Sequence, residues 1–369
     1  MKKHIYTFLA LVLVAQMAWA ANVTPPEQIP SYYANVDGNS EGGLWEAIHV
    51  TAKVGFTSLS YDGLWTSYKT SDVYPADSTE KAGLIWDMYS YCTFPYGPKK
   101  SGGKQCGSYS KECDCYNREH SIPKSWFGGS TSKGTPGTDL FHVVPTDGKV
   151  NGMRGNMPYG EVKEVDYSYD GNKRGTPKAI TITNTILGEE VTATCSENVF
   201  EPMPQYKGDF ARGYMGTLLK WSGDYDKFTT DDGAEIFSSK HSKDGNWGLT
   251  KYGVALLMKW HREDPVSQKE IDRNNGIQQT QGNRNPFIDY PYLAEYIWGE
   301  KAGETVDLSQ LMPSTDPEFV PGESNGWRGG EQAVDEVEEV HRAQKILING
   351  QLVIIIGEQW FTVMGERVK

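Results

Sequence analysis

The stretch NREHSIP (residues 117–123) places a carboxylate, Glu119, directly beside a histidine, His120. A second stretch, DLFHVVP (residues 139–145), has the apolar content of a short strand, and we expect that strand to end at Pro145. Neighbouring residues of a regular strand point to opposite faces. If Glu119 and His120 serve one site, the backbone is therefore expected to leave regular strand geometry near them.

A helix is predicted to begin directly after the second stretch, because Thr146-Asp147 is a typical helix start. Its buried face would consist of three residues at helical spacing: Val150, Met153 and Met157. Asn156 lies on a neighbouring face, from which its amide oxygen can point back toward the strands. Arg154 is about 200° from Asn156 on an ideal helix. We therefore do not expect both side chains to contact one ligand closely.

The rest of the chain predicts a mostly helical domain with few strands. Apolar spacing predicts helices in residues 32–65, 207–221, 250–263 and 292–298. Alternating residues around Gly188 predict a strand pair within residues 178–199. Residues 95–138 are rich in Gly, Ser and Lys, which predicts a long loop, and long loops in compact domains usually carry function. We therefore expect an α+β domain over residues 21–300.

The first twenty residues are typical of a secretory signal peptide. Lys2 and Lys3 form a basic end, an apolar run extends over residues 8–14, and Ala18-Trp19-Ala20 offers a cleavage point after Ala20. The run is shorter than the roughly 20 apolar residues that a membrane span needs. We expect an exported protein that is secreted, periplasmic or at the cell surface, without stable membrane insertion.

The C-terminal region differs in composition from the preceding domain. Residues 301–340 hold 10 acidic and 2 basic side chains with several Pro and Gly, which predicts an acidic linker. In residues 341–369, two apolar runs flank Asn349-Gly350, a strong signal for a β-hairpin. We interpret this segment as a small β tail and a candidate sorting module. The alternative is a hairpin that packs onto the preceding domain.

Composition and charge exclude several classes of protein. The 369 residues include 11 Trp, 21 Tyr and 12 Phe, enough to fill a core, and Gly and Pro show no period, which excludes collagen, coiled coil and disorder. The net charge is −12, and it becomes −14 without Lys2 and Lys3, which argues weakly against a nucleic-acid partner. Residues 97–178 are an exception, with 13 basic and 9 acidic side chains.

Five cysteines in an exported chain indicate disulfides, because thiols oxidise outside the cytoplasm. Four of the cysteines cluster in the sequence: Cys92, Cys106, Cys113 and Cys115. We expect two disulfides among these four, with the pairing left open, and one free thiol at Cys195. A zinc site at Cys113-Asp114-Cys115 with His120 is the alternative. Its spacing lacks the two intervening residues that are typical of zinc knuckles.

Four stretches resemble, in order, the bacterial endonuclease I family of secreted or periplasmic non-specific nucleases. They are residues 117–123, residues 139–145 with 150–156, the stretch KGDFAR (207–212) and the stretch QGNRNPF (281–287). The resemblance spans roughly residues 30–300. It implies a ββα-metal (His-Me finger) motif inside the α+β domain.

The resemblance also implies the roles of individual residues. His120 would be the general base that activates water, and Glu119 and Asn156 would be the protein ligands of one Mg²⁺. Two oxygen ligands suit Mg²⁺, which keeps several waters and takes phosphate oxygens as well; Mn²⁺ or Ca²⁺ could replace it in binding. The expected reaction is hydrolysis of DNA, with RNA also open, leaving 5′-phosphate ends.

The residue that clamps the substrate phosphate is left open. The family often has an arginine in the loop before its second strand, whereas the loop at residues 128–138 offers only Lys133. Arg154 and Arg212 are the other candidates for substrate contact, and Arg212 could equally pair with Asp209 on its own helix. No base-reading element is recognisable, so we expect contacts to phosphate and sugar.

The sequence leaves two other functions as alternatives. An extracellular carbohydrate-binding module would use the many aromatic residues, but it leaves the Glu-His-Asn set unexplained. A glycosidase needs two carboxylates, and Glu119 has only Asp139 and Glu201 as candidate partners. Of the remaining histidines, His142 is expected to be packed inside a strand, and His261 to lie at the solvent edge of a helix.

Overall fold

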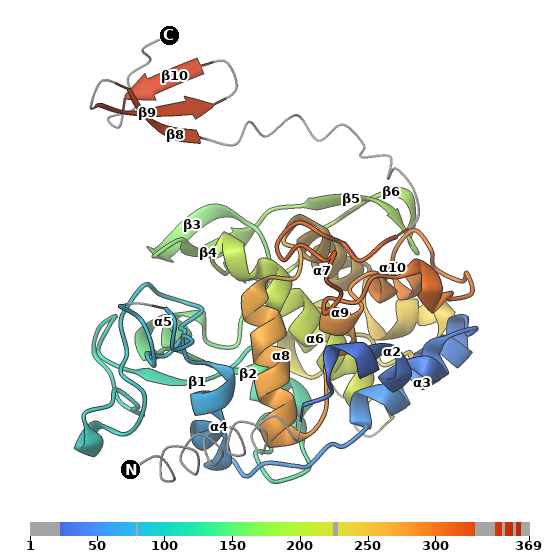
Figure 1. Cartoon of the computed structure of the whole chain (residues 1–369), viewed down its shortest axis with the longest axis horizontal. Helices are drawn as coiled ribbons and strands as arrows, with labels where there is room; N and C mark the ends of the chain where they lie inside the picture. The colour runs from blue at the N-terminus through green and yellow to red at the C-terminus, as the bar shows by residue number, and fades with distance from the viewer. Residues whose placement is uncertain are drawn as a thin grey trace, which may run out of the picture. The chain divides into compact units, whose positions relative to one another are not determined.

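The computed structural model describes residues 23–328, except 79 and 224–227, and three later strands at 344–348, 351–356 and 359–362. The chain forms two compact units, Met1–Arg328 and Gly329–Lys369 (Figure 1). The predicted signal peptide at residues 1–20 lies outside the described residues. Among the described residues, no helix is both long and apolar enough to cross a membrane.

The first unit is built mainly from helices. Its α-helices are α2 (Ile29–Tyr32), α3 (Glu41–Lys53), α4 (Gly63–Ser71), α5 (Gly148–Arg154), α6 (Lys207–Trp221), α7 (Lys251–Glu263), α8 (Gln268–Gln281), α9 (Pro286–Asp289) and α10 (Leu293–Ile297). Short 3-10 turns include η4 (Lys124–Phe127) and η5 (Pro136–Thr138). Its small antiparallel sheets are β1 (Tyr116–His120) with β2 (Val143–Asp147), β3 (Val162–Tyr169) with β4 (Asn172–Pro177) and β7 (Val199–Glu201), and β5 (Ile180–Thr185) with β6 (Gly188–Ala193). The protein is therefore α+β.

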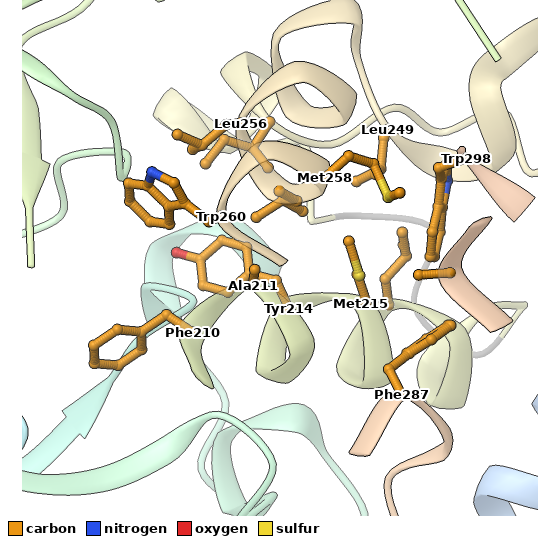
Figure 2. Close-up of a cluster of buried hydrophobic side chains, with 14 of the residues drawn as sticks. Phe210, Ala211, Tyr214, Met215, Leu249, Leu256, Met258, Trp260, Phe287 and Trp298 are labelled. Carbon is orange, nitrogen blue, oxygen red and sulfur yellow. The ribbon is translucent and has the colours of Figure 1, made fainter. Parts of the chain in front are cut away.

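The core lies around α6 and α7. Figure 2 shows α6 side chains such as Tyr214 and Met215 facing Met258 and Trp260 of α7, with Phe287 and Trp298 nearby. Gly213 lets α6 approach the segment before β2, because a Cβ there would meet the carbonyl oxygen of Phe141 at 2.8 Å. This close approach ties the segment that precedes β2 to the rigid helical core.

Several predicted elements are confirmed, and others end at different residues. The helices at 207–221 and 250–263 and the strand pair around Gly188 are present. The predicted helix at 32–65 is broken into α3 and α4, because the chain turns at Gly55, whose φ of +75° suits glycine. A side chain there would also collide with the backbone of Gly282.

The strand predicted at residues 139–145 is shifted along the chain. β2 covers Val143–Asp147, so Pro145 lies inside it and pairs with Arg118 instead of ending it. A two-stranded sheet consists only of edge strands, which tolerate proline. Helix α5 ends at Arg154, followed by Gly155 at φ +61°, so Met157 lies beyond the helix.

Part of the predicted linker belongs to the first unit instead. Residues 301–328 belong to the first compact unit, where Val306, Leu311 and Phe319 are buried and the Trp327 ring stacks on Tyr292 at 5.0 Å. Acidic composition suggested a solvated linker, but these few apolar side chains suffice to attach the segment to the domain. The boundary between the units therefore lies after Arg328.

The second unit contains an antiparallel three-stranded sheet in the order β10-β9-β8. Its strands are β8 (Gln344–Ile348), β9 (Gln351–Ile356) and β10 (Gln359–Thr362). The predicted turn residues Asn349-Gly350 lie outside the described residues.

The prediction of two disulfides and one leftover thiol is confirmed. Cys92 pairs with Cys113 and Cys106 pairs with Cys115, whereas Cys195 is a buried free cysteine. Both disulfides hold the long loop before β1. They also bear on the zinc alternative, because Cys113 and Cys115 are oxidised and cannot serve as thiolate ligands.

Candidate active site

Strand β1 separates the two residues of the Glu-His pair. It pairs with β2 without interruption from Tyr116, opposite Asp147, to His120, opposite Val143. The expected departure from strand geometry is therefore wrong, since Glu119 and His120 alternate along a regular strand and their side chains point to opposite faces of it. Arg118 shares the face of His120.

His120 is held by a backbone carbonyl. Its Nε2 lies 3.1 Å from the oxygen of Gly137 in η5, and the residue is 7% exposed. A carbonyl oxygen can only accept, so Nε2 carries the hydrogen and the neutral ring keeps its lone pair on Nδ1. Burial, followed by the nearby His142, lowers the pKa of His120 well below the usual value of 6.5. The ring is therefore neutral at pH 7, as a proton acceptor must be.

Glu119 lies in a buried polar network on the opposite face. Its Oε1 accepts hydrogen bonds from the Tyr89 hydroxyl at 2.9 Å and from Arg154 Nη1 at 2.5 Å. The Tyr89 hydroxyl also bonds the hydroxyl of Tyr159. Burial raises the pKa of Glu119, and the charge of Arg154 counteracts part of this rise.

Arg154 is fully buried and surrounded by acceptors. Besides Glu119, its guanidinium donates to the carbonyl oxygens of His120, Ser121 and Met157. These bonds fix the end of β1 to the end of α5. Arg154 is thus placed to support the site, and its donors face protein atoms and not a surface where substrate could bind.

Helix α5 owes its position to its N-cap residue, Asp147, and to the disulfide-bonded loop. The Asp147 side chain accepts from the backbone N–H groups of Lys149 and Val150, which caps the helix, and from the N–H of Cys113 in the loop. One carboxylate therefore joins the loop, β2 and α5.

The other predicted site residues lie in different surroundings. Asn156 is exposed, two residues beyond the end of α5. Lys133 is exposed in the loop that leads to Gly137, the partner of His120. Arg212 is fully buried and pairs through two bonds with Glu270, at 2.6 and 2.7 Å, instead of with Asp209. Arg212 therefore belongs to the core.

Three residues beside His120 were missed as site residues. The Tyr61 ring lies 5.9 Å from the His120 ring, the Arg118 guanidinium lies over Tyr61 at 3.4 Å, and Lys124 Nζ lies 5.9 Å from the same ring. Arg118 and Lys124 could have been noticed, because Arg118 lies in the first quoted stretch and Lys124 directly follows it. No pattern in the sequence pointed to Tyr61, which is almost 60 residues away.

The remaining polar candidates are occupied elsewhere. His142 is buried as expected, one residue before β2, whereas the prediction for His261 is wrong, because His261 is buried beside Arg212. Asp139 pairs with buried Lys220, and Glu201 pairs with Lys207. Neither carboxylate is paired with Glu119, so the glycosidase alternative has no support.

Only one group of potential metal ligands of the His, Cys, Asp and Glu types clusters among the described residues. It consists of Cys92, Cys113 and Asp147. Both of these cysteines form one disulfide, and the Asp147 oxygens accept backbone hydrogen bonds. This cluster is therefore a structural feature of the loop and not a metal centre.

Comparison with known proteins identifies the family of the chain. The family model for endonuclease I matches residues 44–292. The extracellular ribonuclease of Bacillus amyloliquefaciens is 32% identical over 283 residues, covering 76% of this chain and 82% of that protein. The extracellular ribonuclease of Bacillus subtilis (strain 168) is 31% identical over 284 residues, covering 76% and 83%. The chain belongs to the endonuclease I family. It is a nuclease, which means a phosphodiester hydrolase.

Proposed function

We propose that the protein is a secreted, metal-dependent endonuclease that hydrolyses DNA and RNA through water activated by His120. The observation that carries this proposal is the contact between His120 Nε2 and the Gly137 carbonyl, because it leaves Nδ1 as the proton acceptor. Water attacks phosphorus, the bond to the 3′ oxygen breaks, and the product ends carry 5′-phosphate and 3′-hydroxyl. Since the 2′-hydroxyl takes no part, both sugars are accepted. The names of the two relatives support RNA as one of the substrates.

One divalent cation, Mg²⁺ in this proposal, would be held by Glu119 and Asn156. The donor atoms suit it, because both side chains offer oxygen, which Mg²⁺ prefers. Among the described residues, both hydrogen bonds to the Glu119 carboxylate end on Oε1, which leaves Oε2 as the oxygen for a cation. When bound, the cation supplies charge stabilisation at the phosphate and the departing 3′ oxygen. Mn²⁺ or Ca²⁺ could occupy the same oxygens.

A cleavage assay with defined substrates tests the proposed function. The purified protein is expected to cut single-stranded DNA, duplex DNA and RNA in Mg²⁺, and to stop reversibly in EDTA. End analysis should find 5′-phosphate on all products and no 2′,3′-cyclic phosphate on RNA. A cyclic phosphate would show that the 2′-hydroxyl is the nucleophile. Cleavage that persists in EDTA would exclude the metal.

The metal ligands can be tested one by one. Glu119→Gln and Asn156→Ala are each expected to raise the Mg²⁺ concentration for half-maximal activity by about tenfold or more. Isothermal titration with Mg²⁺ gives the same comparison without catalysis. Asn151→Ala is the matched control, since Asn151 lies on α5 and its amide donates to Asn117. If Asn151→Ala shifts the Mg²⁺ requirement and Asn156→Ala does not, the amide ligand has been assigned to the wrong residue.

We further propose that residues 1–20 direct export and that residues 341–369 form a sorting module for the cell surface or the medium. The separation of the chain into two compact units after Arg328 supports a removable tail. Nothing in the catalytic proposal depends on this tail. The stretches that carry the family resemblance all lie before it.

Two truncated chains are expected to have different defects, one in export and the other in stability. A chain ending at Arg328 should keep its kcat/KM but fail to reach the surface or medium. A chain ending at Glu300 should lose about 5 kcal/mol of folding free energy, because it lacks the buried side chains of Val306, Leu311 and Phe319. Urea unfolding and fractionation of cells measure the two effects. Equal stability of both truncations would mean that residues 301–328 contribute nothing to the fold.

A further inference from the structure

A nuclease site needs positively charged side chains that can contact the substrate. Two of the predicted side chains, Arg154 and Arg212, cannot do so. Arg154 and Arg212 are fully buried and pair with Glu119 and Glu270. Since the whole chain is strongly acidic, only a local positive surface can overcome repulsion of a polyanion. The cations that do lie beside His120 are Arg118 and Lys124.

Arg118 is positioned on the reacting face of β1. It precedes His120 by two residues, so their Cα atoms lie about 7 Å apart on the same face of the strand. Its guanidinium is held between the rings of Tyr61, at 3.4 Å, and Trp65, at 4.4 Å. It donates from Nη1 to the Tyr61 carbonyl at 2.6 Å. These contacts restrict the side chain to one position before any substrate arrives.

The charge of Arg118 is only weakly compensated. Its nearest carboxylate, Asp62, lies 3.5 Å away and is 93% exposed, so the pair is a surface ion pair of little energy. Both hydrogen bonds that the guanidinium makes to described residues leave from Nη1. Nε and Nη2 are therefore the donors that remain for a phosphate, and the side chain is 15% exposed.

Lys124, which follows His120 in the chain, also lies close to the Tyr61 ring. It begins the short turn η4, it is exposed, and its Nζ lies 5.9 Å from the Tyr61 ring. The two cations and His120 are thus gathered around Tyr61. A guanidinium can bind a phosphate through two hydrogen bonds, and an ammonium adds a mobile point charge.

We propose that Arg118 and Lys124 are the phosphate-binding residues of this site and that Tyr61 holds Arg118 in place. Arg118 binds the phosphate that is attacked by the water at His120, and Lys124 binds a neighbouring phosphate of the same strand. This assignment rests on the proposed nuclease function. It requires no base-specific contact, so it applies to DNA and RNA alike.

Binding measured without cleavage tests the proposal. Full-length His120→Ala is titrated with a labelled 12-nucleotide single-stranded DNA over a range of salt concentrations. Arg118→Ala and Lys124→Ala, each added to this background, are expected to weaken binding about tenfold and to reduce the log–log salt slope by about 0.7 each. Lys163→Ala is the matched control, because Lys163 is an exposed lysine on β3, in a different sheet. Unchanged salt slopes in both variants would overturn the assignment.

Variants of Tyr61 distinguish its role in positioning Arg118 from a general loss of structure. Tyr61→Phe keeps the ring and should retain binding, whereas Tyr61→Leu should weaken binding as Arg118→Ala does. In proteins with His120 intact, Arg118→Ala should mainly raise KM, and Arg118→Lys should restore part of the loss. If the wild-type protein cleaves nucleic acid and these variants match it, only this inference fails. A wild-type protein that does not cleave would overturn the proposed function as well.

Discussion

Replacement of His120 by alanine should lower kcat by about 10²–10⁴-fold while the protein stays folded. The ring makes one hydrogen bond, to the Gly137 carbonyl, and the backbone pairing of β1 with β2 does not depend on it. The loss in rate arises because Nδ1 is the atom that accepts the proton from water in the proposed mechanism. Single-turnover cleavage of a labelled DNA in saturating Mg²⁺ measures the chemical step directly.

A second histidine provides the matched control for this experiment. His49 of α3 also bonds a backbone carbonyl, with Nδ1 2.6 Å from the oxygen of Leu219, but it lies outside the β1, β2 and α5 region. His49→Ala should therefore lose stability without losing its rate per folded molecule. Circular dichroism and urea unfolding report the folded fraction of each variant. Near-normal cleavage by folded His120→Ala would remove the general-base assignment.

Sequence patterns predicted the helices and strands that are determined by residues close to one another in the chain. Helices α6 and α7 and the β5-β6 pair follow from apolar spacing and from one turn at Gly188, and each forms where it was expected. Element ends were harder to predict. The strand β2 includes Pro145, because pairing with β1 outweighs the usual effect of proline, and such pairing involves residues almost 30 positions apart.

The surroundings of charged residues could not be predicted from spacing. The sequence offers Arg154 and Arg212 only as candidates for substrate contact, and their carboxylate partners lie 35 and 58 residues away in sequence, with both pairs buried. A buried ion pair depends on the tertiary fold, so the sequence around one partner carries no trace of it. By contrast, the short motif at residues 117–123 contains Arg118, Glu119 and His120, and Lys124 directly follows it.

Removal of the Arg154 side chain is expected to be the most destabilising change at this site. Arg154→Met leaves the Glu119 carboxylate buried without its counter-ion and removes the guanidinium donors from the carbonyls of His120 and Ser121, although Ser121 keeps a bond from the Tyr214 hydroxyl. Breaking a buried pair in this way typically costs about 3–5 kcal/mol. Urea unfolding with the disulfides intact should show this loss. Arg154→Lys, which keeps the charge but not the planar fork, should show a smaller one.

The double variant distinguishes a supporting role of Arg154 from substrate contact. When Glu119→Gln is combined with Arg154→Met, no uncompensated charge is left, so the double variant should be more stable than Arg154→Met alone. A positive coupling energy of this kind is expected only if the two side chains interact in the folded protein. If Arg154 instead bound substrate, Arg154→Met would weaken nucleic-acid binding and reduce its salt dependence while leaving the free energy of unfolding unchanged. Measuring unfolding and binding on the same four proteins therefore decides between a residue that holds the end of β1 in place and one that holds the phosphate.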